Sequence, residues 1–334
     1  LVEEIVRLYG FENIEGVLPT LPITPPQKNE LRDLEWKVRD FCAAMGFLEV
    51  YNYSFASEID QNFEPNKSHV EVQNPLSGDQ KYLRTNLISN FVKNCESELR
   101  THGKLDFFEF GNIFEKVDNQ VLPNETKHLA LFSAGMGNAE NEDFFRLKAE
   151  ISRVFELLEV KAEFRPCAEP KQYFHPSKSA DIFIDGELVG EIATLHPQFT
   201  TIKNSFINFC EINAEKLLKS SQKSNILYQE ISSFPSVYRD LSIVLNDRTL
   251  ISDIEKVCFE SATYLKKIEL FDEFFDPIKL GKNLKNLAFH LSFKSDERTL
   301  NEQEIDENFN QIVKNLNSKF NAKLRLEFDK EKNS

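Results

Sequence analysis

Apolar residues in the first part of the chain recur at two different spacings. Leu31, Leu34, Val38 and Phe41 lie three or four positions apart, which predicts a helix over 29–46. Aromatic and β-branched runs bounded by polar turns predict strands instead. The further predicted elements are strands over 47–57, 105–117 and 127–135, a helix over 143–160, and a hairpin over 179–197 that turns at Asp185-Gly186. Hairpin-connected strands with interspersed helices predict an antiparallel sheet with helices packed on it.

The C-terminal part of the chain predicts the order β-α-β-β-α-β. The strands are predicted over 239–245, 266–275, 284–294 and 322–328, with helices after the first and third strands. Each helix begins with a capping-box pattern, Ser252 with Glu255 and Thr299 with Glu302. This is the order of a ferredoxin-like domain. Two helices on one face of the sheet leave the other face uncovered, and we call that side the open face.

Strand alternation assigns side chains to the open face. The residues predicted there from the first, third and fourth strands are Ser242, Val244, His290, Ser292, Lys294, Lys323 and Arg325. The second strand is ambiguous, but if Phe271 and Phe275 are core residues, then Asp272 and Phe274 are exposed together. An aromatic ring, a carboxylate and cations suit RNA, through base stacking, base-edge hydrogen bonds and phosphate contacts. The alternative is an ordinary solvated sheet face with one exposed Phe.

Arg239 and Asp240 stand at the mouth of the first predicted strand of this domain. One interpretation is an Arg–Asp ion pair that fixes the entrance of the strand. The other is a pair of polar contacts to a nucleic acid at the edge of the open face.

The net charge of −14 does not favour nucleic-acid binding, because phosphate neutralisation ordinarily requires a basic surface. The charge is uneven, however, since residues 230–334 carry −3 and the first 229 residues carry −11. A local basic patch can therefore exist inside an acidic protein. Its candidates are Lys279, Lys282, Lys285, Lys294 and Arg298.

Five widely spaced cysteines argue against a zinc site or a disulfide framework and predict buried thiols in the cytoplasm. No apolar run approaches the roughly 18 residues needed to cross a bilayer, so no membrane span is predicted. The chain begins without Met inside a predicted helix, and we expect it to be a fragment of a longer protein.

Successive segments of the chain resemble bacterial phenylalanyl-tRNA synthetase β subunits. They include "LVEEIVRLYGFENI", "NPLSGDQKYLRTNLI", "FFEFGNIF" and "GEIATLHP", followed by "FPSVYRDLSIVL", "LFDEF" and "LAFHLSFKSDERTLNEQEI". The resemblance spans essentially the whole chain. It implies an α+β fold, with a class II aminoacyl-tRNA synthetase-like antiparallel core followed by a ferredoxin-like βαββαβ anticodon-binding domain.

The resemblance also implies how the chain is divided. Residues 1–24 would be the tail of a preceding helical domain with its linker, 25–215 the class II-like core, 216–229 a linker, and 230–334 the anticodon-binding domain. The tRNA-binding residues that it implies are Arg239, Asp272, Phe274, His290, Lys294 and Arg325. Phe274 stands where the family usually has Tyr, a change that keeps base stacking and loses a hydroxyl hydrogen bond.

The resemblance implies a core without catalytic residues. Glu115 stands where a catalytic class II subunit has an Arg for the ATP α-phosphate, and a carboxylate repels a phosphate. The segment "NFCEINAEKLL" lacks the glycines and the Arg of the third class II motif. We therefore expect this chain to support the attachment of phenylalanine to tRNA(Phe) within an α2β2 assembly. In that assembly a catalytic α subunit would bind ATP, and the helix over 29–46 is a candidate subunit contact.

Glu3 and Glu4 match a Glu pair that helps to hold Mg²⁺ in this family. The aspartates that complete such a site would lie upstream, so we expect an incomplete site, and the alternative is two solvated charges on a helix. Two other functions remain open. A stand-alone carboxylate-activating enzyme of class II type would bind ATP itself, and a structural or regulatory module would show no salt-sensitive RNA affinity.

Overall fold

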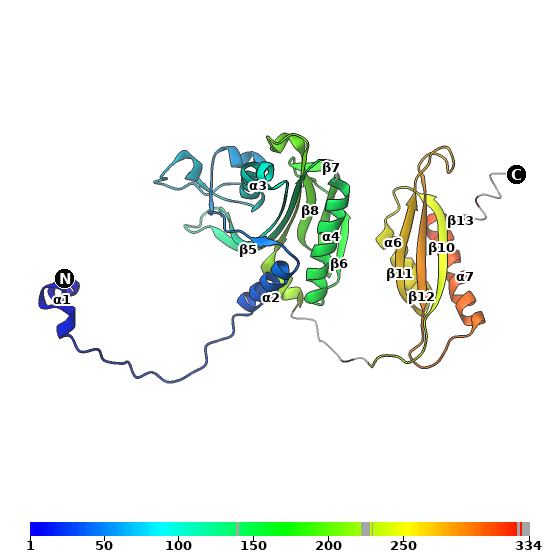
Figure 1. Ribbon diagram of the computed structural model, residues 1–334, viewed down its shortest axis with the longest axis horizontal. Coiled ribbons are helices and arrows are strands. Elements are labelled where there is room, and N and C mark those ends of the chain that lie inside the picture. The colour runs from blue at the N-terminus through cyan, green and yellow to red at the C-terminus, as the bar shows by residue number, and fades with distance from the viewer. Residues whose placement is uncertain (138–139, 222–227, 229, 326–327, 329–334) are drawn as a thin grey trace. The chain divides into compact units, whose positions relative to one another are not determined.

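The computed structural model describes residues 1–137, 140–221, 228, 230–325 and 328 (Figure 1). The chain forms two compact units, Leu1–Asn225 and Ile226–Ser334. In the described part of the chain, every helix is too short or too polar to cross a membrane. The five cysteines are all free thiols.

A seven-stranded sheet is the centre of the larger unit. Its strands are β1 (Leu48–Glu49), β4 (Lys104–Glu115), β5 (Asn124–Met136), β6 (Ala162–Pro166), β7 (Phe174–Ile184), β8 (Glu187–Leu195) and β9 (Ser205–Asn213). The strand order is β1-β4-β5-β9-β8-β7-β6. The short edge strand β1 runs parallel to β4, and every other neighbouring pair is antiparallel. β7 and β8 form the predicted hairpin at Asp185-Gly186, where both residues have positive φ.

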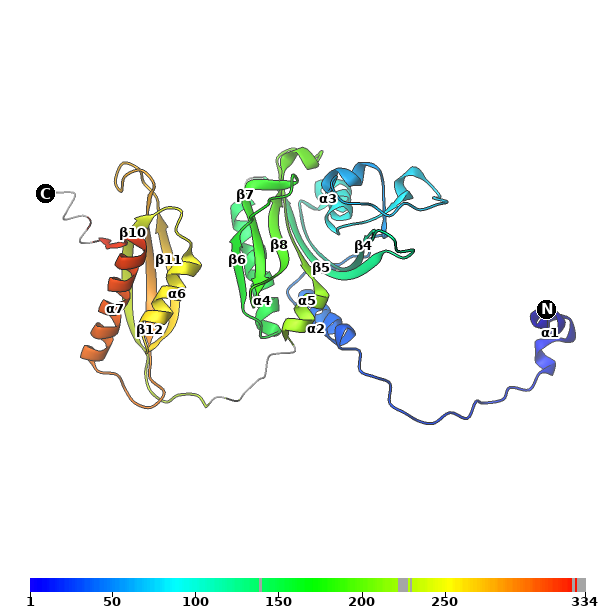
Figure 2. The same cartoon turned by 180° about the vertical axis from the view of Figure 1, so that it is seen from behind.

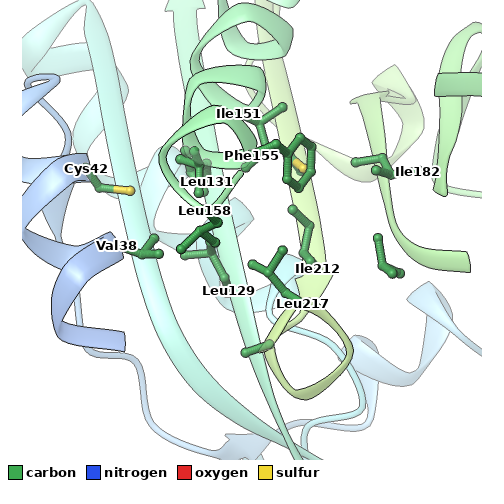
Figure 3. Packing of buried hydrophobic residues seen from close by; sticks show 14 of the residues in the cluster. Val38, Cys42, Leu129, Leu131, Ile151, Phe155, Leu158, Ile182, Ile212 and Leu217 are labelled. Atoms are coloured by element: carbon green, nitrogen blue, oxygen red, sulfur yellow. The ribbon is translucent and has the colours of Figure 1, made fainter. Parts of the chain in front are cut away.

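Helices cover both faces of this sheet (Figures 1 and 2). The helices of the unit are α1 (Val2–Tyr9), α2 (Glu30–Ala44), α3 (Ile88–His102), α4 (Glu140–Leu157) and α5 (Ala214–Ser221). Side chains of α2, α4 and α5 pack on one face, where Val38, Ile151 and Leu217 are buried together (Figure 3). α3 packs on the other face, where Phe91 stacks on Phe132 with ring centroids 3.7 Å apart. Burial of apolar area on both sides is the main force that holds the sheet.

Shorter elements connect the parts of the larger unit. They are a two-stranded sheet of β2 (Phe55–Ala56) and β3 (Tyr82–Leu83), and 3₁₀ helices at Phe11–Asn13, Ile59–Phe63, Gly78–Gln80 and Pro197–Phe199. Arg84 follows β3 directly and forms a buried ion pair with Glu109 of β4, which ties this connection to the sheet. The single strand predicted over 47–57 is instead two short strands, β1 and β2, which belong to two different sheets.

The smaller unit is a four-stranded sheet with two helices on one face (Figure 2). Its elements are β10 (Val237–Asn246), α6 (Ile251–Ser261), β11 (Leu265–Phe274), β12 (Leu284–Phe293), α7 (Glu302–Phe320) and β13 (Lys323–Leu324). The strand order is β11-β12-β10-β13, and all pairs are antiparallel. This arrangement confirms the predicted βαββαβ order and, with the larger unit, the predicted α+β fold class.

Both predicted helix caps in the smaller unit are wrong. α6 begins at Ile251 after Leu250, whose side chain has no oxygen with which to cap a helix. The cap of α7 lies two residues later than predicted, at Asn301 rather than Thr299, and the helix begins at Glu302. Asn301 accepts from the Glu304 amide at 2.9 Å, and Glu304 accepts from the Asn301 amide at 3.0 Å, so the capping box is Asn301 with Glu304.

The linker predicted over 216–229 begins inside α5, which continues to Ser221. Most of its remaining residues lie outside the described part of the chain, as does Leu326 of the last predicted strand.

Candidate nucleic-acid interface

The register of the smaller sheet places side chains from four strands on its open face. These residues are Tyr238, Asp240, Ser242 and Val244 of β10, Lys267, Glu269, Asp272 and Phe274 of β11, Asn286, Ala288, His290 and Ser292 of β12, and Lys323 of β13. They alternate with the buried residues that meet α6 and α7, such as Leu241 and Phe289. Val244, Asn286, Ala288 and Ser292 are buried, so the exposed part of the open face lies chiefly over β10, β11 and His290.

Two β-bulges in β11 change which residues reach this face. One lies between Leu265 and Lys267, and the other between Leu270 and Asp272. At the second bulge Leu270 pairs with Phe289 and Asp272 with Ala288, which leaves Phe271 as the extra residue. Phe271 and Asp272 therefore lie on the same side of the sheet, although they are neighbours in sequence. The alternative in which Phe271 and Phe275 are core residues does not hold, since they are 50% and 56% exposed, and Phe274 is half-buried rather than fully exposed beside Asp272.

A histidine held by a carboxylate lies at the centre of the open face. His290 Nδ1 is 2.7 Å from Asp240 Oδ1, across the β10–β12 pair. The His290 ring also stacks on Phe271, with centroids 4.0 Å apart and an interplanar angle of 14°. On the β11 side Glu269 pairs with His290 across the strands and forms an ion pair with Lys267 at 2.7 Å. This cluster combines aromatic surface with hydrogen-bonding groups.

The second predicted aromatic residue lies nearer the end of the strand. Phe274 pairs with Asn286 and is half-buried, and Lys279 Nζ lies 5.7 Å from the centre of its ring. Asp272 is exposed on the same face. An aromatic face with a nearby ammonium group is suited to a stacked base and its phosphate.

The six sequence-predicted tRNA-binding residues are not all on one face. Asp272, Phe274 and His290 are together on the open face. Lys294 follows β12, and its Nζ donates to the Ser232 carbonyl at 3.3 Å. Arg239 lies two positions before buried Leu241 on β10, so the two side chains point to the same side of the sheet. Its Nη2 lies 3.6 Å from Asp306 of α7. It therefore lies on the helix-covered side. Arg325 lies just after β13 and is half-buried.

Tyr238, Asp240 and Phe271 are exposed on this face and were not among the residues predicted to bind. Tyr238, at 66% exposed, shares the strand parity of Ser242, so simple alternation was enough to find it. Asp240 was considered with Arg239, but its partner is His290 rather than Arg239. Phe271 could not be found by alternation, because the bulge that exposes it has no sequence signal in this strand.

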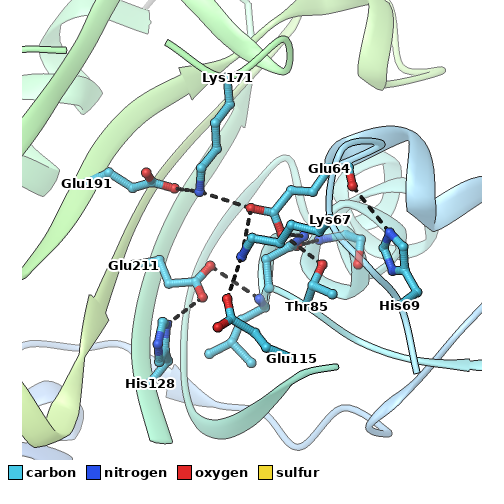
Figure 4. Close-up of polar contacts among 12 residues, drawn as sticks. Glu64, Lys67, His69, Thr85, Glu115, His128, Lys171, Glu191 and Glu211 are labelled. Carbon is cyan, nitrogen blue, oxygen red and sulfur yellow. Dashed lines mark hydrogen bonds and ion pairs between the residues drawn. The ribbon is translucent and has the colours of Figure 1, made fainter. Parts of the chain in front are cut away.

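The larger unit contains a polar cavity of about 320 Å³ on the α3 side of its sheet (Figure 4). Four carboxylates and three lysines line it: Glu64, Glu115, Glu191, Glu211, Lys67, Lys171 and Lys216. Each of these lysines already has a carboxylate partner. Lys67 contacts Glu64 at 3.3 Å and Glu115 at 3.1 Å, Lys171 contacts Glu64 at 3.2 Å and also Glu191, and Lys216 contacts Glu187 at 3.4 Å.

Burial and neighbouring charges shift the pKa values of this network. Burial opposes ionisation of Glu64, but the ammonium groups of Lys171 and Lys67 outweigh it, and the Glu64 pKa falls below its usual value. Hydrogen bonds from Asn86 and Thr85 add to this shift. Burial opposes the charge of Lys171 too, yet the carboxylates around it raise its pKa. Burial raises the pKa of Glu191, and the ammonium group of Lys171 offsets that effect only in part. Carboxylates thus hold each lysine of the cavity, and a triphosphate would have to displace a carboxylate from every one of them.

Glu3 and Glu4 lie next to each other on the exposed helix α1. Glu4 Oε2 accepts a hydrogen bond from Arg7 Nη2 at 2.9 Å. Among the described residues, no set of three or more His, Cys, Asp and Glu side chains is placed to hold a metal ion. Mg²⁺ in proteins is held by oxygen ligands with near-octahedral geometry, so this pair does not by itself form a magnesium site.

The geometry thus defines a two-part α+β protein. It has a helix-flanked sheet of class II synthetase type and a ferredoxin-fold domain with an open aromatic and charged face. Comparison with known families gives the same division. The family of the phenylalanyl tRNA synthetase beta chain CLM domain matches residues 14–203, and the ferredoxin-fold anticodon binding domain matches residues 232–325. The chain belongs to the phenylalanyl-tRNA synthetase β-chain family, as its sequence predicted.

Curated relatives agree with this assignment. The phenylalanine–tRNA ligase beta subunits of Bacillus cereus and Carboxydothermus hydrogenoformans are 30% and 31% identical to the chain. That of Fusobacterium nucleatum is 29% identical. Each match covers 97% of this chain and 42% of the relative. The chain thus spans less than half the length of these relatives.

Proposed function

We propose that this chain acts as part of the β subunit of a phenylalanine–tRNA ligase and binds the anticodon region of tRNA(Phe) through its open face. The observation that carries the proposal is the group of Asp272, Phe274 and His290 on the uncovered side of the ferredoxin-fold domain. Its rings offer stacking surfaces, and its carboxylate and imidazole offer base-edge contacts. Lys279 lies 5.7 Å from the centre of the Phe274 ring, and Lys267 lies on the same face in an ion pair with Glu269, so both ammonium groups are near enough to contact phosphates.

A second part of the proposal is assembly with a catalytic α subunit in an α2β2 complex. Apolar side chains are exposed where α2 meets β1 and the residues after it: Trp36 is 51% exposed, Leu48 63% and Tyr51 75%. Arg39 of α2 joins this helix to β1. Its guanidinium lies 4.8 Å from the Trp36 ring and donates to Glu49 of β1 at 2.6 Å. Exposed apolar groups of this size, rimmed by polar ones, are typical of a subunit interface.

We further propose that the larger unit is not catalytic, and that ATP is bound by the α subunit in the complete complex. The pairing of Glu115 with Lys67 supports this, because the resemblance implies a phosphate-binding Arg at this position in a catalytic subunit, and this chain has a carboxylate paired with a lysine instead. Mg²⁺ binding at Glu3 and Glu4 would require ligands from outside the described residues. A cytoplasmic location is part of the proposal, supported by five free cysteines in the described structure.

The alternative of a stand-alone carboxylate-activating enzyme predicts that this chain binds ATP. Titration of the full chain with ATP tests it, and saturable binding would favour that alternative over ours. The alternative of a structural module predicts no salt-sensitive affinity for RNA, which the next experiment measures.

The experiment that tests RNA binding uses the full chain and a tRNA(Phe) anticodon stem-loop over a salt series. We expect affinity to fall with rising salt, and Phe274→Ala to weaken binding about fivefold to a hundredfold, as loss of one stacked base does. Phe275→Ala is the matched control, since Phe275 is an exposed neighbour just beyond the end of β11. A scrambled anticodon that binds equally well, or equal effects of the two Phe variants, would contradict the proposal.

A further inference from the structure

Asp240 and Phe271 hold the imidazole ring of His290 in place on the open face, and this ring can carry a positive charge. A carboxylate only accepts hydrogen bonds, so the 2.7 Å contact makes His290 Nδ1 the donor to Asp240. Nε2 is then the ring nitrogen that gains or loses a proton. Stacking on Phe271 at 4.0 Å restricts rotation of the ring from its other side. The His290 side chain is still 46% exposed, so the held ring remains accessible.

The charges that face His290 come from both neighbouring strands and from the residues near it along its own strand. β10 contributes Asp240, and β11 contributes Glu269, which is itself paired with Lys267. The electrostatic influence of His290 contributes to the lowered pKa of Glu269, after the larger effect of Lys267. Asp272 lies further along β11 on the same face, and Lys294 follows on β12 with its ammonium group on the Ser232 carbonyl. Carboxylates therefore outnumber cations immediately around the ring.

We propose that Asp240 and Phe271 are positioning residues for His290, and that protonation of the held imidazole strengthens RNA binding at the open face. The inference rests on the proposed RNA-binding function. In the imidazolium form Nε2–H is a charged donor that suits a phosphate or a base carbonyl oxygen. In the neutral form Nε2 is only an acceptor and the positive charge is lost. Histidine is the side chain that ordinarily changes charge between pH 5 and 8, which sets the pH range of the test.

The test measures the affinity of the full chain for the anticodon stem-loop between pH 5.5 and pH 8 at fixed salt. We expect wild-type affinity to fall about fivefold to tenfold as pH rises, which is the size of one charge-assisted hydrogen bond at a partly exposed site. His290→Gln keeps a polar side chain that cannot titrate, and it should remove most of this dependence. His102→Gln is the matched control, because His102 also faces a carboxylate, Glu98 at 3.5 Å, but lies in the larger unit.

Two more variants test the positioning roles. Asp240→Asn keeps the size of the side chain and removes its charge, so the midpoint of the pH profile should move to lower pH. Phe271→Leu keeps apolar volume and removes the ring stack, so it should weaken binding at pH 5.5 more than at pH 8. A merely structural role for either residue would lower affinity equally at every pH.

Each outcome of this series decides a different point. Binding that is independent of pH, or a pH dependence that survives in His290→Gln, would overturn the inference and leave the RNA-binding function standing. Absence of RNA binding at every pH would overturn the proposed function and the inference with it. A pH dependence that His290→Gln removes and His102→Gln retains supports both.

Discussion

Arg84 Nη1 donates a hydrogen bond to Glu109 Oε1 at 2.8 Å, and both side chains are only 3% exposed. Arg84 also donates from Nε to the Asn112 carbonyl at 2.9 Å, so the pair joins the segment after β3 to two positions on β4. Glu109→Gln would leave a buried guanidinium without its counter-charge. We expect it to lower the free energy of unfolding by about 3–5 kcal/mol, measured by urea denaturation of the full chain.

The control for this prediction is the exposed ion pair of Arg165 and Glu163 on the edge strand β6. Glu163→Gln should change the free energy of unfolding by less than about 1 kcal/mol. Equal losses from Glu163→Gln and Glu109→Gln would show that burial does not govern the strength of these pairs.

Acid should destabilise the larger unit through Glu64. Its pKa in the folded protein lies below the usual 4.5, because Lys171 and Lys67 outweigh the effect of burial. The folded state therefore binds this proton more weakly than the unfolded state does. The resulting stability is complete above about pH 4.5 and is lost as pH falls through the lowered pKa.

Denaturation of the wild-type chain and of Glu64→Gln from pH 7 to pH 3 measures this contribution. Wild-type stability should fall more steeply below pH 4.5 than that of Glu64→Gln, and the variant should be less stable at pH 7. If the free energy of unfolding fell equally steeply with pH for the two proteins below pH 4.5, Glu64 would be excluded as the cause of the acid sensitivity.

The capping box of α7 predicts that a substitution at Asn301 destabilises the helix, whereas the sequence pattern alone would predict this effect at Thr299. Asn301→Ala removes the side-chain acceptor of the Glu304 amide and should cost about 1 kcal/mol. Ser252→Ala changes a residue that has the same capping pattern but lies inside α6, and its effect should stay within about 0.5 kcal/mol. Thermal unfolding of the two variants measures both values. A larger loss from Ser252→Ala would contradict the assigned start of α6.

Gly190 is a position on β8 where the backbone of β9 leaves no room for a side chain. A Cβ placed there would lie 2.4 Å from the Glu211 carbonyl oxygen and 2.9 Å from the Ile212 Cα. Because backbone atoms in a paired strand cannot move aside, Gly190→Ala should destabilise the larger unit by about 1–3 kcal/mol. Gly78→Ala, where a Cβ meets no atom within 4 Å, should leave thermal stability nearly unchanged. Similar melting temperatures for both variants would disprove the steric argument.

Arg239 should contribute little to RNA binding. Its guanidinium lies on the helix-covered side, near Asp306 and, at 4.0 Å, near Glu302. Arg239→Ala should leave stem-loop affinity at fixed salt within about twofold of wild type, whereas Phe274→Ala weakens it clearly. A loss of affinity with Arg239→Ala that matches the Phe274→Ala effect would mean that the RNA reaches the helix side of the domain.

Periodicity was enough to predict most of the architecture. The stripe from Leu31 to Phe41 gave α2, and the alternation of Leu241, Ile243 and Leu245 gave the buried side of β10. Such patterns are visible in sequence because one face of each element is buried. The edge strand β6 was not predicted, since it is only five residues long and only Ala162 and Phe164 of it pack against the core, which is too short a pattern to recognise in sequence.

The candidate site was predicted less completely, for two physical reasons. The partners of Arg239 and Asp240 lie on α7 and β12, at least fifty positions away in the chain, where local patterns carry no information. The start of α7 has two overlapping capping patterns, and only the packed helix selects Asn301 over Thr299. Asp272, Phe274 and His290 remain proposed binding residues, and the structure adds Phe271 and Asp240 to them.

Because of the bulge at Phe271, the number of residues in β11, and not their types, decides which side chains of this strand lie on the open face. In a strand without the bulge, side chains alternate between the two faces. The first residue after Leu270 would then lie on the open face, and the second would point toward α6 and α7. Deleting Phe271 would therefore keep Asp272 outward but take away the aromatic neighbour of His290. Keeping Phe271 without the bulge would turn Asp272 inward. Insertions and deletions in β11 are thus the changes to which this surface is most sensitive, and a substitution scan would not reveal that sensitivity.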